Sequence, residues 1–227
     1  MPISLPPPGS ALVIVVDPAL VGTELTTCLS PEERQQAKRF RFEKDAIHWR
    51  ACRAALRSVL GEALGIPPET VAFEFGEFGK PSLASPQHAL HFNLSHCRDL
   101  ALIALCRDGA VGIDIEPADR SASLLGCEDA FCHLDEITLL PEDHHSRATM
   151  LMTIWTKKEA LLKALGTGMS LAPQSVSVDD PPANYVSNPR FQDFRLHRLL
   201  QAPLENHLAF LAAPESVGRI EIQQWPT

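Results

Sequence analysis

The alternation of hydrophobic and polar residues along the chain predicts short strands and two long helices. An apolar, β-branched run at 12–16 indicates a buried strand. Over about 44–60 and about 146–165, apolar residues recur at the spacing of a helix face. A shorter helix is predicted after Ser30, where a capping serine is followed by a proline and, three residues after the cap, by a glutamate. Gly166 is the expected terminator of the last helix.

Several strands are predicted between and after the long helices. The segments 71–75 and 90–95 alternate as half-buried strands do, and 100–106 is continuously apolar. Asp108-Gly109 is a hairpin signal that leads directly into 111–117. We therefore expect 90–95, 100–106 and 111–117 to lie in one sheet. Short strands that complete a second sheet are predicted at 176–178, 194–199, 208–212 and 220–222, and a loop at 180–189.

The strand predicted at 111–117 carries two acids on one face. Because successive side chains of a strand point to opposite faces, Asp114 and Glu116 share one face, and Ile113 and Ile115 share the other. Neighbouring carboxylates repel each other and need a cation, a proton or open water. Magnesium binds carboxylates together with substrate phosphates. A metal site and an edge strand with its acidic face in water are both compatible with this pattern.

The predicted helices carry charged residues at helical spacing. Arg50, Arg53 and Arg57 form a basic stripe, which is compatible with a solvated face and with an anion site. In the last helix, Glu159 and Lys163 lie four residues apart. Such a pair can simply stabilise the helix by ~0.2–0.5 kcal/mol.

Composition narrows the classes of function. The contents of 45% hydrophobic and 21% charged residues are ordinary for a globular protein. The net charge of -8 argues against nucleic-acid binding, and no apolar run reaches the roughly 20 residues of a membrane span. The six cysteines form no Cys-x-x-Cys pair, and Cys127, Cys132 and His133 lack a partner pair for zinc. We expect reduced cysteines and a cytoplasmic protein without membrane contact.

Four motifs follow one another along the chain. They are Gly79-Lys80-Pro81, Phe92-Asn93-x-Ser95-His96, Val111-Gly112-Ile113-Asp114-Ile115-Glu116, and Trp155-x-x-Lys158-Glu159-Ala160-x-x-Lys163-Ala164-x-Gly166. Each is weak alone, but their order and spacing resemble those of the 4'-phosphopantetheinyl transferase family. The spacing is similar to that of the two-domain, surfactin-synthetase-activating type rather than that of the short trimeric holo-acyl-carrier-protein synthases.

The resemblance implies transfer of phosphopantetheine from coenzyme A to a serine of an apo acyl or peptidyl carrier protein, with release of adenosine 3',5'-bisphosphate. Asp114, Glu116 and Glu159 would hold Mg²⁺ against the pyrophosphate. Glu159 could also accept the serine proton, with a water relay as the alternative. The expected catalytic residues are Asp114, Glu159 and Lys163.

The resemblance also implies contacts to coenzyme A, the co-substrate. Lys163 and Lys158 would stabilise the pyrophosphate charge, and Arg53 and Lys80 would meet the 3'-phosphate and the pyrophosphate. Ser95 and His96 would meet the nucleotide phosphates from a turn between strands. Arg39 and Arg50 are secondary candidates, and Trp155 is expected in the core.

The fold implied by the resemblance is α+β. Two similar α/β halves are related by a pseudo-twofold axis, and each is a small antiparallel sheet packed on a long helix. Residues 1–109 would provide the nucleotide contacts, and residues 110–227 the magnesium site and the catalytic helix. The chain is expected to be a monomer that docks its carrier protein within 118–145, through Leu124, Leu125 and Phe131.

Two other functions use the same residues. A magnesium-dependent phosphodiesterase or pyrophosphatase acting on coenzyme A-like substrates would employ the three acids with water as the nucleophile. A binding protein with an inactive site would have lost one of Asp114, Glu116, Glu159 or Lys163, and all four are present.

Overall fold

The computed structural model describes residues 2–84, 90–178 and 193–225. The predicted loop at 180–189 lies outside these residues. The α-helices are α1 (Pro31–Ala37), α2 (Glu43–Leu64), α3 (Glu128–Phe131), α4 (Leu134–Thr138) and α5 (His144–Leu165). The strands are β1 (Ser10–Val16), β2 (Phe73–Phe75), β3 (Pro81–Leu83), β4 (His91–His96), β5 (Ala101–Cys106), β6 (Gly112–Pro117), β7 (Phe194–Arg198), β8 (His207–Pro214) and β9 (Arg219–Trp225).

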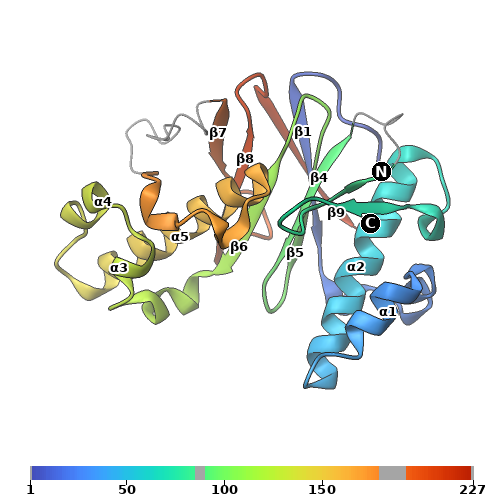
Figure 1. The fold of residues 1–227 in the computed structure, drawn as a ribbon, viewed down its shortest axis with the longest axis horizontal. Coiled ribbons are helices and arrows are strands. Elements are labelled where there is room, and N and C mark those ends of the chain that lie inside the picture. Colours follow the sequence, from blue (N-terminus) through green and yellow to red (C-terminus); the bar gives the residue numbers. More distant parts are fainter. Residues whose placement is uncertain (1, 85–89, 179–192, 226–227) are drawn as a thin grey trace.

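The layers follow the order helix, sheet, sheet, helix (Figure 1). The first sheet has the strand order β4-β5-β1-β9 and packs on α2, whereas the second has the order β6-β8-β7 and packs on α5. Both long helices contain 22 residues. The expected α+β fold of two halves, each a small sheet on a long helix, is therefore confirmed, but the first sheet is mixed instead of antiparallel because β9 runs parallel to β1.

Strand β1 illustrates why the sheets stack. Its residues Leu12 and Ile14 pack toward α2, while Ala11, Val13 and Val15 pack toward the second sheet. Every residue of this strand is buried, because both of its faces meet an apolar layer.

Two predicted pairings are wrong. Strand β5 lies between β4 and β1, so both of its edges are already hydrogen-bonded, and β6 pairs with β8 in the other sheet. The Asp108-Gly109 segment is therefore a passage between sheets instead of a hairpin. The strand predicted at 220–222 is part of β9, which lies in the first sheet and runs parallel to β1 instead of completing the second sheet. The segment 176–178, also predicted as a strand, forms none.

The helix ends follow the predicted signals. Ser30 and Glu33 form a reciprocal capping box at the start of α1. Gly166 ends α5 in the left-handed conformation, with φ 72°. None of the helices in the described part of the chain combines the length and the apolar character that a membrane crossing requires.

Close packing between β6 and α5 depends on a glycine. A Cβ atom at Gly112 would lie 2.0 Å from the carbonyl oxygen of Ala160 and 2.3 Å from the amide nitrogen of Ala164. Only glycine therefore allows the backbones of strand and helix to approach this closely. This contact brings the acids of β6 beside the charged residues of α5.

Candidate active site

Strand β6 directs its acids toward α5. Ile113 and Ile115 are buried in the core between the sheets, so Asp114 and Glu116 lie on the opposite face, as predicted. Asp114 is only 4% exposed, whereas Glu116 is half-buried. The buried carboxylate therefore needs a compensating partner.

That partner comes from α5 and from the other half of the molecule. The Lys163 ammonium lies 2.6 Å from Asp114 Oδ1 and donates a 3.0 Å hydrogen bond to Ser95 Oγ. The Ser95 hydroxyl donates in turn to Asp114 Oδ1 at 2.9 Å. Ser95 belongs to β4, so this triangle joins the two sheets. The side-chain carbonyl of Asn93, also on β4, accepts a 2.9 Å bond from the backbone amide of Ile113.

Two further carboxyl groups belong to the same electrostatic environment. Burial raises the pKa of Glu159; the Lys163 ammonium opposes this shift, and the charges of Asp114 and Glu116 add to it. Burial and then the Asp114 charge raise the pKa of Glu116. The pKa values of Glu116 and Glu159 are thus raised mainly by burial, and repulsion by the neighbouring carboxylate charges adds to the shift.

Trp155 contributes to this group beyond its expected role in the core. It is half-buried, with its ring edge-on to Phe131 at a centroid distance of 5.3 Å. A hydrogen bond to the Trp155 side chain also lowers the pKa of Glu116, against the effect of burial. The i, i+4 spacing of Trp155 and Glu159 places both on one face of α5, which is the sequence signal that Trp155 lies near the acids.

The acidic group has the donor chemistry of a site for a hard cation. Asp114 Oδ2 is buried and has no hydrogen-bond partner among the described residues. The three carboxylates do not form one of the tight ligand clusters found in residues 2–84, 90–178 and 193–225, and the Lys163 ammonium is the cation that Asp114 contacts. A cation could therefore take the free oxygen of Asp114, with Glu116 and Glu159 drawn toward it.

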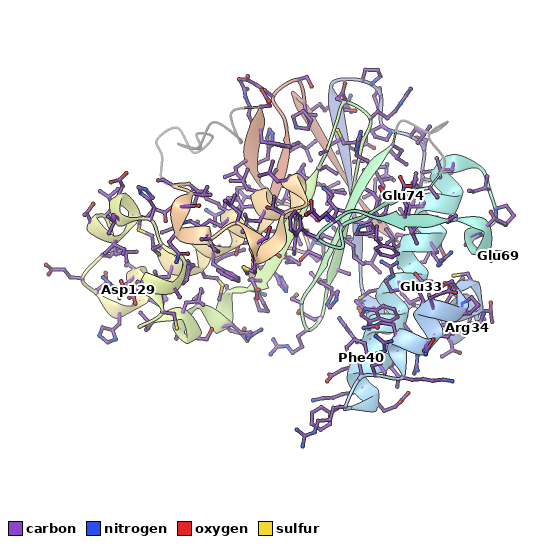
Figure 2. The ribbon with its side chains drawn as sticks, viewed as in Figure 1. Glu33, Arg34, Phe40, Glu69, Glu74 and Asp129 are labelled. Carbon is purple, nitrogen blue, oxygen red and sulfur yellow. The ribbon has the colours of Figure 1, made fainter. Side chains whose placement is uncertain are left out.

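Arg53 and His96 line one cavity of about 440 Å³, together with Trp49. The Arg53 guanidinium contacts Glu33 Oε1 at 2.7 Å, and Glu33 Oε2 binds Arg57 at 2.6 Å. Figure 2 shows Glu33 on α1, beside α2. The arginine stripe is thus partly neutralised by one buried glutamate, which sequence reasoning recognised only as a capping residue.

The ammonium of Lys80 joins the two halves. It donates hydrogen bonds to the backbone oxygens of Val111, at 3.0 Å, and Ala164, at 2.7 Å. Burial lowers the pKa of Lys80 to about 8. Lys80 lines a cavity of about 400 Å³ that is not the one lined by Arg53, although Pro81 lines both.

The assignment of Lys158 to the coenzyme A phosphates is wrong. Its side chain is 1% exposed, and its ammonium lies 2.6 Å from Glu136 Oε2. The same nitrogen donates to the backbone oxygens of Phe131 and Pro173. Lys158 neighbours Glu159 in sequence, but adjacent helix residues point to different faces. Lys158 therefore anchors the segment after β6 to α5.

The secondary candidates lie away from the acids. Arg39 is exposed and bonds Gln36, whereas Arg50 pairs with Glu43 at 2.6 Å. Arg50 lines another cavity, of about 770 Å³, that contains neither Arg53 nor His96.

Comparison with known proteins agrees with these features. The family model described as the 4'-phosphopantetheinyl transferase superfamily matches residues 110–210, and the one described as 4'-phosphopantetheinyl transferase, N-terminal, matches residues 22–107. The chain is 36% identical over 152 residues to the 4'-phosphopantetheinyl transferase HetI of Nostoc sp., which covers 65% of this chain and 63% of the relative.

Two other relatives extend the comparison. A putative 4'-phosphopantetheinyl transferase of Synechocystis sp. is 30% identical over 178 residues, or 78% of this chain and 72% of the relative. The 4'-phosphopantetheinyl transferase Sfp of Bacillus subtilis is 30% identical over 150 residues, or 66% of each chain, which supports the predicted type. The matched part thus spans between 63% and 72% of these three relatives. The chain belongs to the 4'-phosphopantetheinyl transferase superfamily.

Proposed function

We propose that this protein transfers 4'-phosphopantetheine from coenzyme A to a serine of an apo acyl or peptidyl carrier protein and releases adenosine 3',5'-bisphosphate. The observation that carries the proposal is the buried Asp114 carboxylate, which is held by Lys163 and Ser95 and keeps one oxygen free of hydrogen bonds. The names of the relatives support the same reaction.

Asp114, Glu116 and Glu159 are proposed to hold Mg²⁺. The free oxygen of Asp114 and the mutual repulsion of the acids fit a divalent cation. When bound, the ion would neutralise charge on the pyrophosphate during attack at phosphorus. The protein's own contribution is to position the acids on a rigid strand and helix.

Lys163 and Glu159 are proposed to act on the reacting groups. The Lys163 ammonium lies beside Asp114, where it could also bind a pyrophosphate oxygen. Burial brings the pKa of Glu159 closer to neutral, which favours its use as a proton acceptor for the serine hydroxyl, directly or through a water molecule.

The nucleotide of coenzyme A is proposed to lie in the cavity lined by Arg53 and His96. Arg53 would offer its guanidinium to a phosphate while Glu33 keeps it in place. We assign Ser95 to the positioning of Asp114 and Lys163, because its hydroxyl is already bonded to both. Two backbone carbonyls take two of the three N–H donors of Lys80, which leaves one donor for a phosphate.

The carrier protein is proposed to dock on the segment 118–145. From the sequence, Phe131 is expected to contact the carrier protein. It is only 3% exposed and belongs to the core, so it is not available for docking. Leu124 and Leu125 are half-buried, whereas Leu134 and Leu139 are 76% and 54% exposed. We therefore place the apolar docking contacts on the two exposed leucines. We also propose that the protein acts as a monomer in the cytoplasm.

Intact-protein mass spectrometry tests the reaction class. An apo carrier protein incubated with this protein, coenzyme A and magnesium should gain the mass of one phosphopantetheine, and EDTA should abolish the gain. If free phosphopantetheine accumulated with no modified carrier, the hydrolase function would replace the proposal. If coenzyme A bound but gave neither product, the protein would be a binding protein.

A further inference from the structure

Three side chains with metal-binding atoms meet outside the acidic site. His48 and Cys52 lie one turn apart on α2, and His96 lies at the end of β4. Their ligand atoms all lie within 4.8 Å of one another. The rings of His48 and His96 approach edge to face, with their centroids 5.1 Å apart. The trio thus joins the long helix to the first sheet.

The His48 ring lacks a hydrogen bond that its burial would require. Its Nε2 atom is buried and has no partner among the described residues. A buried polar atom without a partner has lost its water without gaining a hydrogen bond, which is costly for the fold. Cys52, at 1% exposure, is equally withdrawn from water. A ligand that accepts electron pairs from both atoms would remove this cost.

We propose that His48, Cys52 and His96 form a binding site for a soft divalent cation such as Zn²⁺. Two imidazole nitrogens and one thiolate are the donors that zinc prefers, and a set of three leaves a fourth position open. On binding, the S–H bond of Cys52 is replaced by a sulfur–metal bond, and one proton leaves to solvent. No oxidant or reductant is involved. Magnesium, which prefers oxygen ligands, would not compete.

An ion can reach the site from the surface. His48 lines a cavity of about 420 Å³, and His96 is an exposed residue that lines the cavity shared with Arg53. An ion on His96 would fix its ring at the place where we position the nucleotide of coenzyme A. We therefore expect the soft cation to inhibit by competing with coenzyme A. This consequence rests on the proposed function, but the metal binding does not.

A second cluster, formed by Cys97, Asp99 and His207, is a weaker candidate. There Asp99 Oδ1 already bonds Cys97 Sγ at 3.3 Å and His207 Nε2 at 3.1 Å. The Asp99 carboxylate thus already holds the Cys97 thiol and His207 Nε2, although His207 Nδ1, like His48 Nε2, is buried without a partner among the described residues. The first trio is favoured because its thiol lies beside an imidazole with a nitrogen that makes no hydrogen bond to a described residue, whereas the thiol of Cys97 is already bonded to Asp99.

Titration of the reduced, metal-free protein with Co²⁺ tests the site without coenzyme A or carrier protein. Bound cobalt should give one thiolate-to-metal charge-transfer band per chain, which Zn²⁺ removes and excess Mg²⁺ does not. Cys52→Ala should abolish the band, while Cys28→Ala, the control at another buried cysteine, should retain it. His48→Ala should weaken binding by at least about tenfold.

Specific outcomes would overturn the site. They are the absence of a band in the natural protein, or a band that persists in Cys52→Ala. A band lost only in Cys97→Ala would assign the metal to the other cluster and overturn the proposal equally. Circular dichroism checks that each variant is folded, and His48→Ala carries the test if Cys52→Ala does not fold.

Discussion

The ammonium of Lys80 donates a 2.7 Å hydrogen bond to the backbone oxygen of Ala164. This bond ties a loop of the first half to the last turn of α5, and a second bond from the same nitrogen reaches Val111. Lys80 therefore holds the catalytic helix against the first half as well as lying near the proposed substrate cleft. Its half-buried charge is held by backbone carbonyls instead of a carboxylate, which makes its effect on stability depend on pH.

The stability contributed by Lys80 should increase at alkaline pH. Burial lowers the pKa of Lys80 from 10.5 to about 8, so between these values the unfolded chain binds more protons than the folded chain. The free energy of unfolding therefore rises with pH in this window. Relative to Lys80→Met, the natural protein should gain about 2 kcal/mol between pH 7 and pH 10. Denaturant unfolding at both pH values measures this, and a constant difference would contradict it.

Asp114→Asn should abolish activity while the protein remains folded. The substitution keeps the shape of the side chain but removes the charge that binds Lys163 and, by our proposal, the metal. We expect roughly a 10³-fold loss in kcat/KM for carrier modification, with an intact thermal transition. Glu159→Gln should behave similarly. Glu215→Gln, which changes an exposed acid outside the site and the proposed docking segment, is the matched control. Normal transfer by both active-site variants would contradict their assignment.

Lys158→Met should affect stability instead of substrate binding. Removal of the ammonium leaves the Glu136 carboxylate, which is 0% exposed, without its cation. Breaking such a pair typically costs about 3–5 kcal/mol. The double variant Glu136→Gln/Lys158→Met should regain much of that loss, which thermal melting will show. Below its melting temperature, the single variant should keep its KM for coenzyme A; a large rise in KM would return Lys158 to the phosphate site.

Leu134→Ser and Leu139→Ser should weaken docking of the carrier protein. Both leucines are exposed, so their replacement should leave the melting temperature nearly unchanged. We expect the KM for the carrier to rise severalfold and the KM for coenzyme A to remain constant. Leu20→Ser, at a 67% exposed leucine elsewhere, is the control. Equal effects of all three substitutions on both KM values would argue against this surface.

The sequence predicted local features well because their causes are local. The capping box of Ser30 and the alternation that separates Asp114 from Ile113 depend only on neighbouring residues. The predicted pairing of β5 with β6 is wrong because strands compete for the same partner. Strand β1, from the beginning of the chain, pairs with the edge of β5 that the hairpin signal assigned to β6. Local signals contain no information about such a distant competitor.

The candidate site was predictable to a similar extent. Spacing placed Glu159 and Lys163 on one helix face, and the motifs linked them to Asp114. The bond from Lys163 on α5 to Ser95 on β4 joins two elements that lie far apart in the chain, so no sequence spacing could reveal it. Glu136, which determines the role of Lys158, lies in a segment without a periodic charge pattern.

The return of β9 to the first sheet has a consequence for biogenesis. Strand β1 is made early, yet its parallel partner at Arg219–Trp225 is made more than two hundred residues later. During synthesis, one edge of β1 remains without its native partner while all strands of the second sheet are synthesised. The nascent chain is thus exposed to mispairing along that edge, and its first half matures only when the last strand is in place.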